Sequence, residues 1–279
     1  MHAVQCDSYG GGAAGLKHVE VPIPKPSKGE LLLKLEATSL NPVDWKIQKG
    51  MLRPLLPLKF PWIPATDVAG EVLDVGPGVK NFKIGDKVVS MLNTFKGGGL
   101  SDPSPATNIL ITAASGGVGQ YAVQLAKLGN VHVTATCGAR NIDLVKSLGA
   151  DEVLDYKTPE GAILKSPSDK KYDVVIHCAT PIPWSTFEPN LGPKGKVIDI
   201  TPGMSAIWTS FVKKVTCSKK QLVPILLYPK ANNLEYLVGL VKEGKVKTVI
   251  DSKHPLKKAE EAWAKSIDGH ATGKIIVEP

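Results

Sequence analysis

The segment of residues 113–119 constrains this chain more than any other, because it joins the pattern of a strand to the pattern of a helix through three glycines. Residues 109–112 form an apolar run typical of a buried strand, and residues 120–127 carry apolar side chains that a helix can pack. Compared with the dinucleotide-binding pattern G-x-G-x-x-G, the segment has alanine in the first place, Gly116 in the second and Gly119 in the third. Gly116 allows the backbone to approach a pyrophosphate, and Gly119 allows the helix to pack closely on the strand. The segment therefore predicts a pyrophosphate site at a helix N-terminus, with a tight structural turn as the alternative.

Strand and helix patterns alternate after this turn. The strands are near-continuous apolar runs, which indicates burial on both faces of a sheet. Such alternation predicts an α/β fold with a doubly wound parallel sheet, the Rossmann arrangement. We expect strands at residues 131–136, 152–156, 173–178 and 196–200, with a helix at 142–148.

The first hundred residues have a different rhythm and predict a β-rich unit. Glycines and prolines punctuate this part of the chain, which is typical of short strands joined by turns. Its strands are expected at residues 30–37, 68–75 and 87–92. The tail is expected to contain helices at 233–242 and 257–266 and strands at 248–250 and 274–277, which can return to the first unit.

A chain of 279 residues fits about two domains. We expect residues 1–100 and 245–279 to form the β-rich domain and residues 101–244 to form the Rossmann domain. The passage between Val89 and Ala106 offers only short stretches rich in glycine, serine and proline, and nothing in it can complete the first domain or form a connecting helix. We therefore expect residues to be missing between Leu100 and Ser101.

Charge and composition exclude several classes of protein. The net charge is +8, but the lysines are dispersed with few aromatic residues between them, so we expect no nucleic-acid partner. An anionic cofactor, an anionic membrane or a solvated surface without a partner each explains the charge. No uncharged apolar run reaches about 18 residues, so no transmembrane helix is expected. The four cysteines lie far apart without metal-like spacing, which predicts free thiols in a reducing compartment.

The end of the second Rossmann strand indicates which dinucleotide binds. Sites that prefer NAD usually place Asp or Glu there to hold the ribose 2′-hydroxyl. Residues 136–141 contain no acid, and Arg140 can pair with a 2′-phosphate. The sequence therefore predicts NADP(H), and a solvated Arg140 near a helix start is the alternative.

Stretches along nearly the whole chain resemble the zinc-independent quinone oxidoreductase branch of the medium-chain dehydrogenase/reductase family. Residues 41–50, 53–57 and 137–141 are similar in particular to plant members found at the chloroplast envelope. The other matching stretches are residues 63–72, 85–88, 113–126, 148–151 and 271–275.

The resemblance implies a GroES-like catalytic domain, rejoined by the tail, around a central Rossmann domain, with the active site in the cleft between them. Zinc-dependent relatives carry a cysteine ligand at the position of Asn41 and a histidine ligand at that of Asp67. They also carry a four-cysteine structural lobe that this chain lacks, so the resemblance implies no metal. Relatives have several dozen more residues between the positions of Leu100 and Ser101, in agreement with the gap expected above.

Three polar residues are the catalytic candidates that the resemblance implies. Asn41 and Lys46 match positions near the nicotinamide ribose, where Lys46 can donate a hydrogen bond or start a proton relay and Asp44 can orient it. Such donors would stabilise the enolate that develops when a hydride adds to an enone or quinone without zinc. The alternatives are a turn residue for Asn41, a surface lysine for Lys46 and a helix-capping carboxylate for Asp44.

The remaining candidates are cofactor contacts. Thr180 and Thr201 follow two strands of the sheet, whose carboxyl ends line the ligand crevice, although both also suit turns beside prolines. Tyr156 matches a family tyrosine that approaches the 2′-phosphate, or it is a partly buried strand residue. Many relatives have lysine at Asn141, for which Arg140 can substitute. The expected cofactor residues are Ser115, Gly116, Gly117, Val118, Thr136, Gly138, Arg140, Asn141, Tyr156, Thr180, Thr201 and Lys274.

Residues 204–229 mix apolar and basic side chains. They can cap the substrate pocket, contact another subunit in a homodimer or lie against an anionic membrane, and a pocket or core position is our preferred interpretation. The plant members are peripheral proteins of the chloroplast inner envelope membrane, and the resemblance implies that location here.

The leading functional hypothesis is an NADPH-dependent reductase of hydrophobic, lipid-derived α,β-unsaturated carbonyls, ketols or quinones. The alternative is a membrane-associated protein that binds NADPH with little turnover. An alcohol dehydrogenase is disfavoured, because the zinc ligands are missing.

Overall fold

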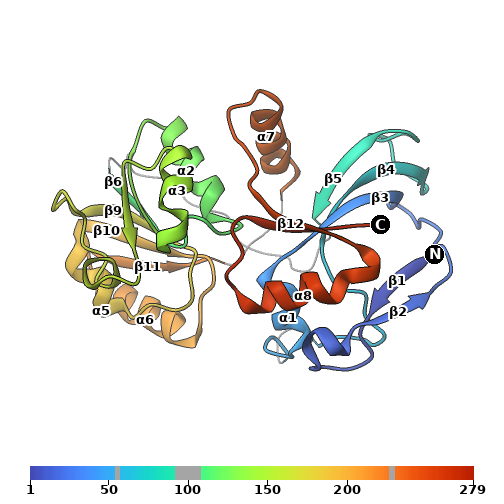
Figure 1. Cartoon of the computed structure of the whole chain (residues 1–279), viewed down its shortest axis with the longest axis horizontal. Coiled ribbons are helices and arrows are strands. Elements are labelled where there is room, and N and C mark those ends of the chain that lie inside the picture. The colour runs from blue at the N-terminus through green and yellow to red at the C-terminus, as the bar shows by residue number, and fades with distance from the viewer. Residues whose placement is uncertain (54–56, 92–107, 226–229) are drawn as a thin grey trace. The chain divides into compact units, whose positions relative to one another are not determined.

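The computed structural model describes residues 1–53, 57–91, 108–225 and 230–279 (Figure 1). The chain divides into two compact units. Unit 1 comprises Met1–Thr94 and Ile250–Pro279, and unit 2 comprises Phe95–Val249. The expected gap between Leu100 and Ser101 lies outside the described residues.

Unit 2 is built on a six-stranded sheet in which all neighbouring strands are parallel. The strand order is β11-β10-β9-β6-β7-β8, so the chain reverses its direction of travel across the sheet between β6 and β9. This is the doubly wound order of a Rossmann sheet, and the predicted fold class is confirmed. The strands are β6 (Asn108–Ile111), β7 (His132–Cys137), β8 (Glu152–Asp155), β9 (Tyr172–His177), β10 (Leu191–Asp199) and β11 (Gln221–Pro224).

Both faces of this sheet are buried, as the apolar strands predicted. Ile109 and Ile111 of β6 belong to one hydrophobic cluster and Leu110, between them, to the other, as the two-residue repeat of a strand requires. Val123 packs in the first cluster, and Phe187 packs in the second. The helices of unit 2 are α2 (Gly119–Leu128), α3 (Ile142–Ser147), α4 (Pro159–Ala162), α5 (Trp184–Phe187), α6 (Met204–Val215) and α7 (Ala231–Lys242).

Unit 1 contains a five-stranded sheet of order β12-β13-β3-β4-β5 and a separate β1-β2 pair. The last two strands lie parallel to each other, and β13 pairs antiparallel with β3, so the tail is part of this sheet. The strands are β1 (His2–Gln5), β2 (Lys17–Glu20), β3 (Leu31–Leu40), β4 (Asp67–Val75), β5 (Lys87–Met91), β12 (Ile250–Pro255) and β13 (Lys274–Glu278).

Helix α8 (Ala259–Asp268) closes the core of unit 1 and lies beside α1 (Pro42–Gln48) (Figure 1). Trp263 is 2% exposed and packs with residues from both ends of the chain. Its indole N–H donates to Gln48 Oε1 at 3.1 Å, and Gln48 in turn donates to the carbonyl of Gly12 at 2.8 Å. A single buried amide therefore connects three separate segments of unit 1.

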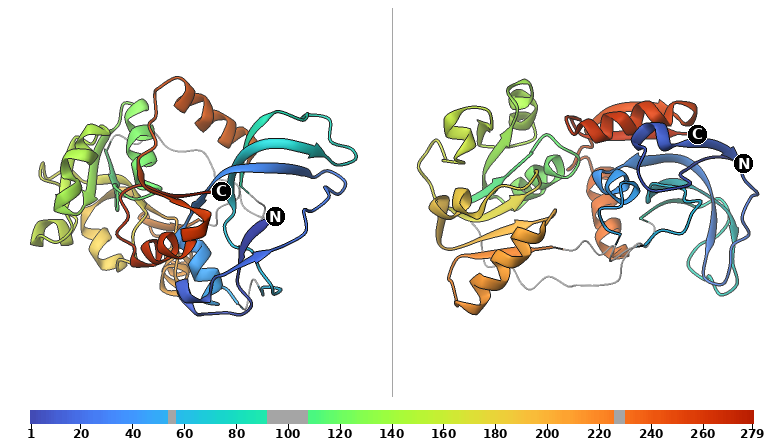
Figure 2. Two further views of the ribbon diagram at one scale, coloured as in Figure 1. Left: turned by 45° about the vertical axis from the view of Figure 1, so that its right-hand side comes forward. Right: turned by 90° about the horizontal axis from the view of Figure 1, so that it is seen from below.

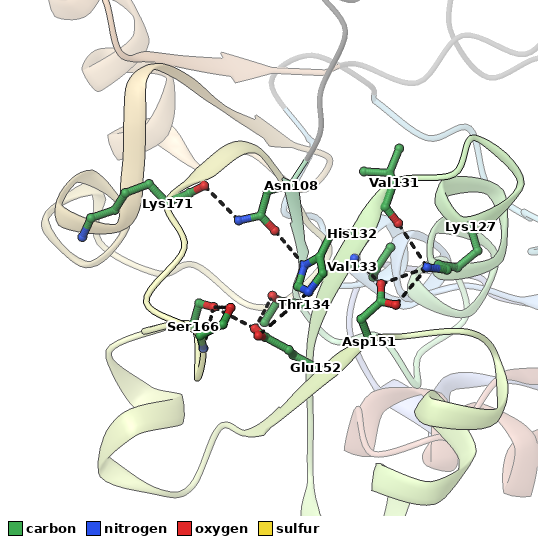
Figure 3. A network of polar contacts seen from close by, with 11 residues as sticks. Asn108, Lys127, Val131, His132, Val133, Thr134, Asp151, Glu152, Ser166 and Lys171 are labelled. Atoms are coloured by element: carbon green, nitrogen blue, oxygen red, sulfur yellow. Dashed lines mark hydrogen bonds and ion pairs between the residues drawn. The ribbon is translucent and has the colours of Figure 1, made fainter.

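A polar network joins the amino-terminal ends of three strands in unit 2, on the edge of the sheet opposite the glycine turn (Figure 3). His132 Nδ1 lies 3.0 Å from Asn108 Oδ1, and Asn108 donates to the carbonyl of Lys171 at 2.9 Å. Glu152 accepts hydrogen bonds from Thr134 and Ser166 at 2.9 and 2.7 Å. These contacts hold strands together at the edge that carries no ligand site in folds of this kind.

The predicted strand at 248–250 was wrong in its position. The observed strand β12 begins at Ile250, because Val249 and Lys247 hydrogen-bond to side chains of α2 instead of to a neighbouring strand. The sequence interpretation also missed α6 and β11, which the structure places within residues 204–224.

Candidate functional site

The glycine turn leaves the carboxyl end of β6 in a conformation that hydrogen bonds to the end of β7 fix. Ala113 has a φ of 49°, in the left-handed region, and the N–H of Ala114 donates to the carbonyl of Thr136 at 2.8 Å. The Thr136 hydroxyl accepts the Ala113 N–H at 3.2 Å. Thr136, a predicted cofactor residue, is 4% exposed, so it supports the turn on the end of β7.

Gly119 fills the third glycine position for the reason that the pattern predicts. A Cβ at this residue would lie 2.3 Å from the carbonyl oxygen of Ala113 and 2.7 Å from the Cα of Ala114. Helix α2 can therefore begin this close to β6 only with glycine. Its first turn carries no acidic side chain, and Val118 at the cap makes no side-chain hydrogen bond, so the turn of Ser115, Gly116 and Gly117 leads into an N-terminus suited to an anion.

Several predicted residues gather where β7 and β8 end. Asn141 donates to Ser115 Oγ at 3.0 Å, which joins the loop after β7 to the glycine turn. A Cβ on Gly138 would lie 3.6 Å from the ring of Tyr156, so these two residues are neighbours. Arg140 is exposed in the same loop. Arg140, Asn141 and Tyr156 thus lie in the segments that follow β7 and β8, near the strand end that meets the adenosine ribose in proteins of this fold.

Lys157 is a further cation at this edge, which sequence reasoning missed. Its Nζ lies 5.9 Å from the centre of the Tyr156 ring, in cation–π geometry. The position immediately after a candidate phosphate-binding tyrosine was the signal that could have identified it.

The ends of β9 and β10 carry the two predicted threonines. Thr201 Oγ1 donates to the carbonyl of Ala179 at 3.0 Å, and its N–H donates to Asp199 at 2.9 Å, which links the two strand ends. Thr180 is exposed in the loop after β9. Both residues lie at the carboxyl edge of the sheet, as expected.

A buried histidine at this edge has a partner that the sequence interpretation did not identify. His177 is 2% exposed, and its Nδ1 lies 2.9 Å from Thr112 Oγ1. The same hydroxyl accepts the N–H of Cys178 at 2.9 Å, so it joins the ends of β6 and β9. Burial lowers the pKa of His177, so the ring is neutral and supports the start of the glycine turn. Burial also raises the pKa of the Cys178 thiol to about 12, which makes it a poor nucleophile.

A second polar cluster lies in unit 1, where β3, β4 and β13 meet the start of α1. Asn41 Nδ2 and Ser39 Oγ each donate to Asp67 Oδ2 at 2.7 Å. Lys274 donates to Asn41 Oδ1 at 2.5 Å, and its Nζ lies 3.6 Å from Asp67 Oδ2. The predicted catalytic residue Asn41 and the predicted cofactor residue Lys274, from opposite ends of the chain, are thus direct neighbours.

Asp44 belongs to the same cluster but does not orient Lys46, so this prediction was wrong. Its Oδ2 accepts the backbone N–H of Asn41 at 2.7 Å, while its Oδ1 is buried without a partner. Residues two apart on a helix point in different directions, and Lys46 instead lies 5.7 Å from the centre of the Trp45 ring. Burial, together with nearby Asp67, raises the pKa of Asp44 to about 7, although the Asn41 N–H opposes this shift.

The donor atoms of this cluster do not suit zinc. Protein zinc sites use cysteine, histidine and carboxylate ligands, whereas here an amide and a carboxylate share the ammonium of Lys274. Within residues 1–53, 57–91, 108–225 and 230–279, no three His, Cys, Asp or Glu residues form a group that could hold a metal ion.

Known proteins match both units. Residues 27–133 match the family model described as alcohol dehydrogenase GroES-like domain, and residues 148–277 match that described as zinc-binding dehydrogenase. The "Chloroplast envelope quinone oxidoreductase homolog" of Arabidopsis thaliana is 67% identical to this chain over 324 residues. The alignment covers 100% of this chain and 98% of that protein. That alignment has 45 more positions than the 279 residues of this chain, so the relative contains residues that this chain lacks.

Two more distant proteins extend the comparison. The "NADPH-dependent alkenal/one oxidoreductase, chloroplastic" of Arabidopsis thaliana is 27% identical, over 100% of this chain and 80% of that protein. The solved quinone oxidoreductase of Coxiella burnetii superposes with a TM-score of 0.83 at 26% identity and covers 100% of this chain and 99% of that one. The resemblance inferred from the sequence is confirmed by these matches.

Proposed function

Because this chain belongs to the medium-chain dehydrogenase/reductase family, in its quinone oxidoreductase branch, we propose that it is an NADPH-dependent enzyme that reduces α,β-unsaturated carbonyls, ketols or quinones without zinc. The acceptor is a hydrophobic, lipid-derived small molecule in this proposal.

The glycine turn supports the part of the proposal that concerns the cofactor. Its close helix–strand packing at Gly119 and its position at the carboxyl edge of a doubly wound sheet favour a dinucleotide. Arg140, Tyr156 and Lys157 favour the 2′-phosphate of NADPH, because they supply positive charge and a hydroxyl where a site for NAD would place an acid. Ser115, Gly138 and Asn141 complete this set of predicted contacts.

The cluster of Asn41, Asp67 and Lys274 supports the part of the proposal that concerns the reduction of the acceptor. Bound NADPH supplies a hydride, and the oxygen of the acceptor gains negative charge as the hydride adds. The Lys274 ammonium, held on Asn41, has N–H groups left to donate to that oxygen. A fixed positive charge here would take the place of the metal ion of zinc-dependent relatives.

The names of the relatives also bear on where the protein acts. The names of the two Arabidopsis thaliana relatives include the chloroplast, and one of them names the chloroplast envelope. We therefore place this chain in the chloroplast as part of the proposal. In the described residues, no helix is long and apolar enough to cross a membrane.

A turnover assay tests the proposal. Purified full chain is mixed with NADPH or NADH and with a panel of enones, ketols and quinones, and the loss of reduced-nicotinamide absorbance is followed. We expect oxidation of NADPH in preference to NADH with at least one acceptor class, unchanged after dialysis against a chelator. Tight NADPH binding without oxidation by any acceptor would contradict the proposed reductase activity and favour a protein that only binds the cofactor. Loss of activity after chelation would contradict the zinc-free mechanism and favour a metal-dependent alcohol dehydrogenase.

A further inference from the structure

A cavity of about 480 Å³ lies within unit 2, at the amino-terminal ends of β9 and β10. One wall is formed by residues 162–171, which lead from α4 to β9, and the other by residues 185–190, which lead from α5 to β10. The glycine turn lies at the carboxyl edge of the same sheet, and the six residues of β9 span about 17 to 20 Å. The cavity is therefore separate from the candidate cofactor site, and its volume is in the range of small-molecule sites, about 300 to 1,000 Å³.

Buried side chains hold both walls of the cavity in place. Asn190 is 9% exposed, and its Nδ2 donates to the carbonyls of Ile163 at 2.7 Å and Thr186 at 3.0 Å, which joins one wall to the other. The hydroxyl of buried Tyr172 donates to the carbonyl of Leu164 at 3.1 Å. Leu164 has a φ of 59°, a left-handed conformation that a leucine keeps only where the surrounding structure fixes it. The cavity is thus preformed, and a ligand would need to order little of the protein.

The cavity is positively charged. Three lysines and one aspartate line it and give it a net charge of +2. Lys165 pairs with Asp169 at 2.8 Å, and Lys171 donates one N–H to the carbonyl of Pro189 on the opposite wall at 2.9 Å. Lys170 is exposed and has no hydrogen bond or ion pair with any residue in the described ranges. Lys170 and the two remaining N–H groups of Lys171 are therefore available to an anion.

A neighbouring acid does not cancel this charge. Glu188, beside the cavity residue Pro189, pairs with Lys213 at 2.8 Å, and its carbonyl accepts a hydrogen bond from Lys220 at 2.7 Å. Lys213 belongs to α6, which lies along the edge strand β11 (Figure 2). The ion pair with Lys213 also lowers the pKa of Glu188, so this acid is fully ionised and matched by a lysine outside the cavity.

Helix α6 does not itself contribute to the cavity. None of the described residues in the range 204–229 lines it. Met204 is 82% exposed and Trp208 is 67% exposed, so both side chains face outward. Our preferred interpretation of this segment as pocket or core was therefore wrong for the outward face.

The lining indicates the chemistry of the ligand. Ser185 and Thr186 bring hydroxyl groups, and Asn190 retains its amide oxygen as an acceptor because both of its N–H hydrogens are used. These groups match the hydroxyls of a polyol, and lysine ammonium groups bind phosphate. The described residues that line the cavity include no aromatic side chain, so a nucleobase would find no stacking surface. A concave site of this size favours a small molecule over a macromolecule.

We propose that this cavity binds a phosphate monoester of a sugar or another polyol. Lys170 and Lys171 bind the phosphate, and Ser185, Thr186 and Asn190 bind the hydroxyl groups. This binding goes beyond the proposed reductase activity and depends neither on turnover nor on the nicotinamide cofactor.

Isothermal titration of the full chain tests the proposal, with glucose 6-phosphate, glucose and inorganic phosphate as probes. We expect glucose 6-phosphate to bind more tightly than inorganic phosphate, with an affinity that falls as salt is added, and glucose not to bind. No binding of glucose 6-phosphate at millimolar concentrations would overturn the proposal. Equal affinity for glucose 6-phosphate and inorganic phosphate, or for glucose 6-phosphate and glucose, would overturn the proposed ligand class.

Substitutions separate the two halves of the ligand. Lys170→Gln with Lys171→Gln should weaken the binding of both phosphate probes about tenfold or more, because charge-assisted hydrogen bonds are lost. Ser185→Ala with Thr186→Val should weaken glucose 6-phosphate about threefold or more and leave inorganic phosphate unchanged. Unchanged phosphate binding in this second variant also reports that the cavity is intact.

A matched control removes the same charge elsewhere on unit 2. Lys214→Gln with Lys219→Gln changes two exposed lysines that do not line the cavity. This variant should bind glucose 6-phosphate like the unmodified chain. Equal losses in the control and in the Lys170 and Lys171 variant would attribute the binding to net charge and overturn the proposal.

Nuclear magnetic resonance locates the probe without any substitution and without NADPH. Addition of glucose 6-phosphate should shift the backbone amide signals of residues 163–171 and 185–190 and leave those of residues 115–118 in place. Shifts confined to residues 115–118 would show that the probe occupies the glycine turn, and the proposal would fail. Because this measurement needs no turnover, it succeeds or fails independently of the proposed reductase activity.

Discussion

Asp44 is a carboxylic acid held in a buried position at the start of α1. It is 1% exposed, one of its oxygens has no partner, and its pKa is raised from 3.8 to about 7. The folded protein therefore binds more protons at this site than the unfolded chain between these pH values. The free energy of unfolding must fall as the pH rises from about 4 to about 7, because the carboxylate becomes charged in a buried position.

Replacement by asparagine makes this effect measurable. Three pKa units correspond to about 4 kcal/mol, so Asp44→Asn should remove about 2 to 4 kcal/mol of the loss of stability between pH 5 and pH 8. The new amide oxygen can still accept the Asn41 N–H. Urea unfolding at the two pH values measures the difference, with exposed Asp74→Asn as the control. The same pH dependence in both variants would contradict the raised pKa.

Lys274 has two interpretations that kinetics can separate. If its ammonium donates to the acceptor oxygen, Lys274→Met should lower kcat about 100-fold while the Kd for NADPH changes less than about threefold. If it binds the cofactor, as the sequence predicted, the Kd should rise and kcat should recover at saturating NADPH. Stopped-flow turnover and fluorescence titration give the two numbers. Lys253→Met, an exposed lysine paired with Glu278, is the control.

Arg140 should determine the preference between the two nicotinamide cofactors. A charge-assisted hydrogen bond to a phosphate contributes about 1.5 to 3 kcal/mol, so Arg140→Ala should weaken NADPH binding roughly 10- to 100-fold and leave NADH binding unchanged. Lys146→Ala removes the same charge from an exposed position near the end of α3 and should change neither affinity. Isothermal titration with both cofactors measures the effect. Equal weakening of NADPH and NADH would show that Arg140 does not contact the 2′-phosphate.

At the residue scale, the sequence indicated which residues lie near one another at the carboxyl edge of unit 2 better than it did for the cluster of unit 1. Arg140, Asn141 and Ser115 lie in the loops that follow the adjacent parallel strands β6 and β7, so their proximity follows from one β-α-β unit. Lys274 and Asn41 are 233 positions apart, and their contact depends on a strand pairing that no local pattern specifies.

Helix α2 performs a task that its sequence pattern does not reveal. Gln120 donates to the carbonyl of Val249 at 3.1 Å and accepts its N–H at 2.5 Å, and Gln124 binds the backbone of Lys247 in the same way at 2.9 and 2.8 Å. Two side-chain amides thus replace a neighbouring strand. Local pattern could not predict this, because glutamine at these positions also fits an exposed helix face.

Removal of one amide tests this arrangement. Gln120→Ala leaves two backbone groups of Val249 without partners, so it should lower the free energy of unfolding by about 1 to 3 kcal/mol and speed amide exchange at Val249. Tyr121→Phe removes only an exposed hydrogen bond to Thr248 and should have a small effect on both. Hydrogen exchange that is equally fast in the two variants would contradict the prediction.

The elements that sequence patterns predicted well are those whose apolar face is buried. Strands β3, β4, β6, β7, β8 and β9 all begin and end within a few residues of the expected positions. Helix α6 was missed although its apolar residues recur three or four positions apart, because residues 204–229 were interpreted by their mixed apolar and basic composition and not by that spacing.

For the whole molecule, the two units should respond separately to substitution and to ligand. Trp263→Ala creates a cavity in the core of unit 1 and should cost about 3 to 5 kcal/mol there, whereas Tyr172→Ala should weaken unit 2. NADPH should raise the unfolding temperature of unit 2, which contains the glycine turn. Differential scanning calorimetry with and without NADPH measures these shifts. A single transition that moves equally in both variants would show that the units unfold together.

The two-unit division was visible in the change from β-rich to alternating rhythm. The return of the tail to the first domain was expected from the resemblance, and β13 pairs with β3 of unit 1. The partner strand could not be predicted, since the apolar pattern of β13 fits any strand of either sheet.

This pairing also sets an order of events during synthesis of the chain. Leu40 pairs with Ile275, so a ribosome that adds about 5 to 20 residues per second needs on the order of 10 to 50 s to deliver the partner. Unit 2 is continuous in sequence and can fold during that time. The apolar strand β3 must wait with one edge unpaired, which makes the nascent first segment the part of this protein most in need of a chaperone.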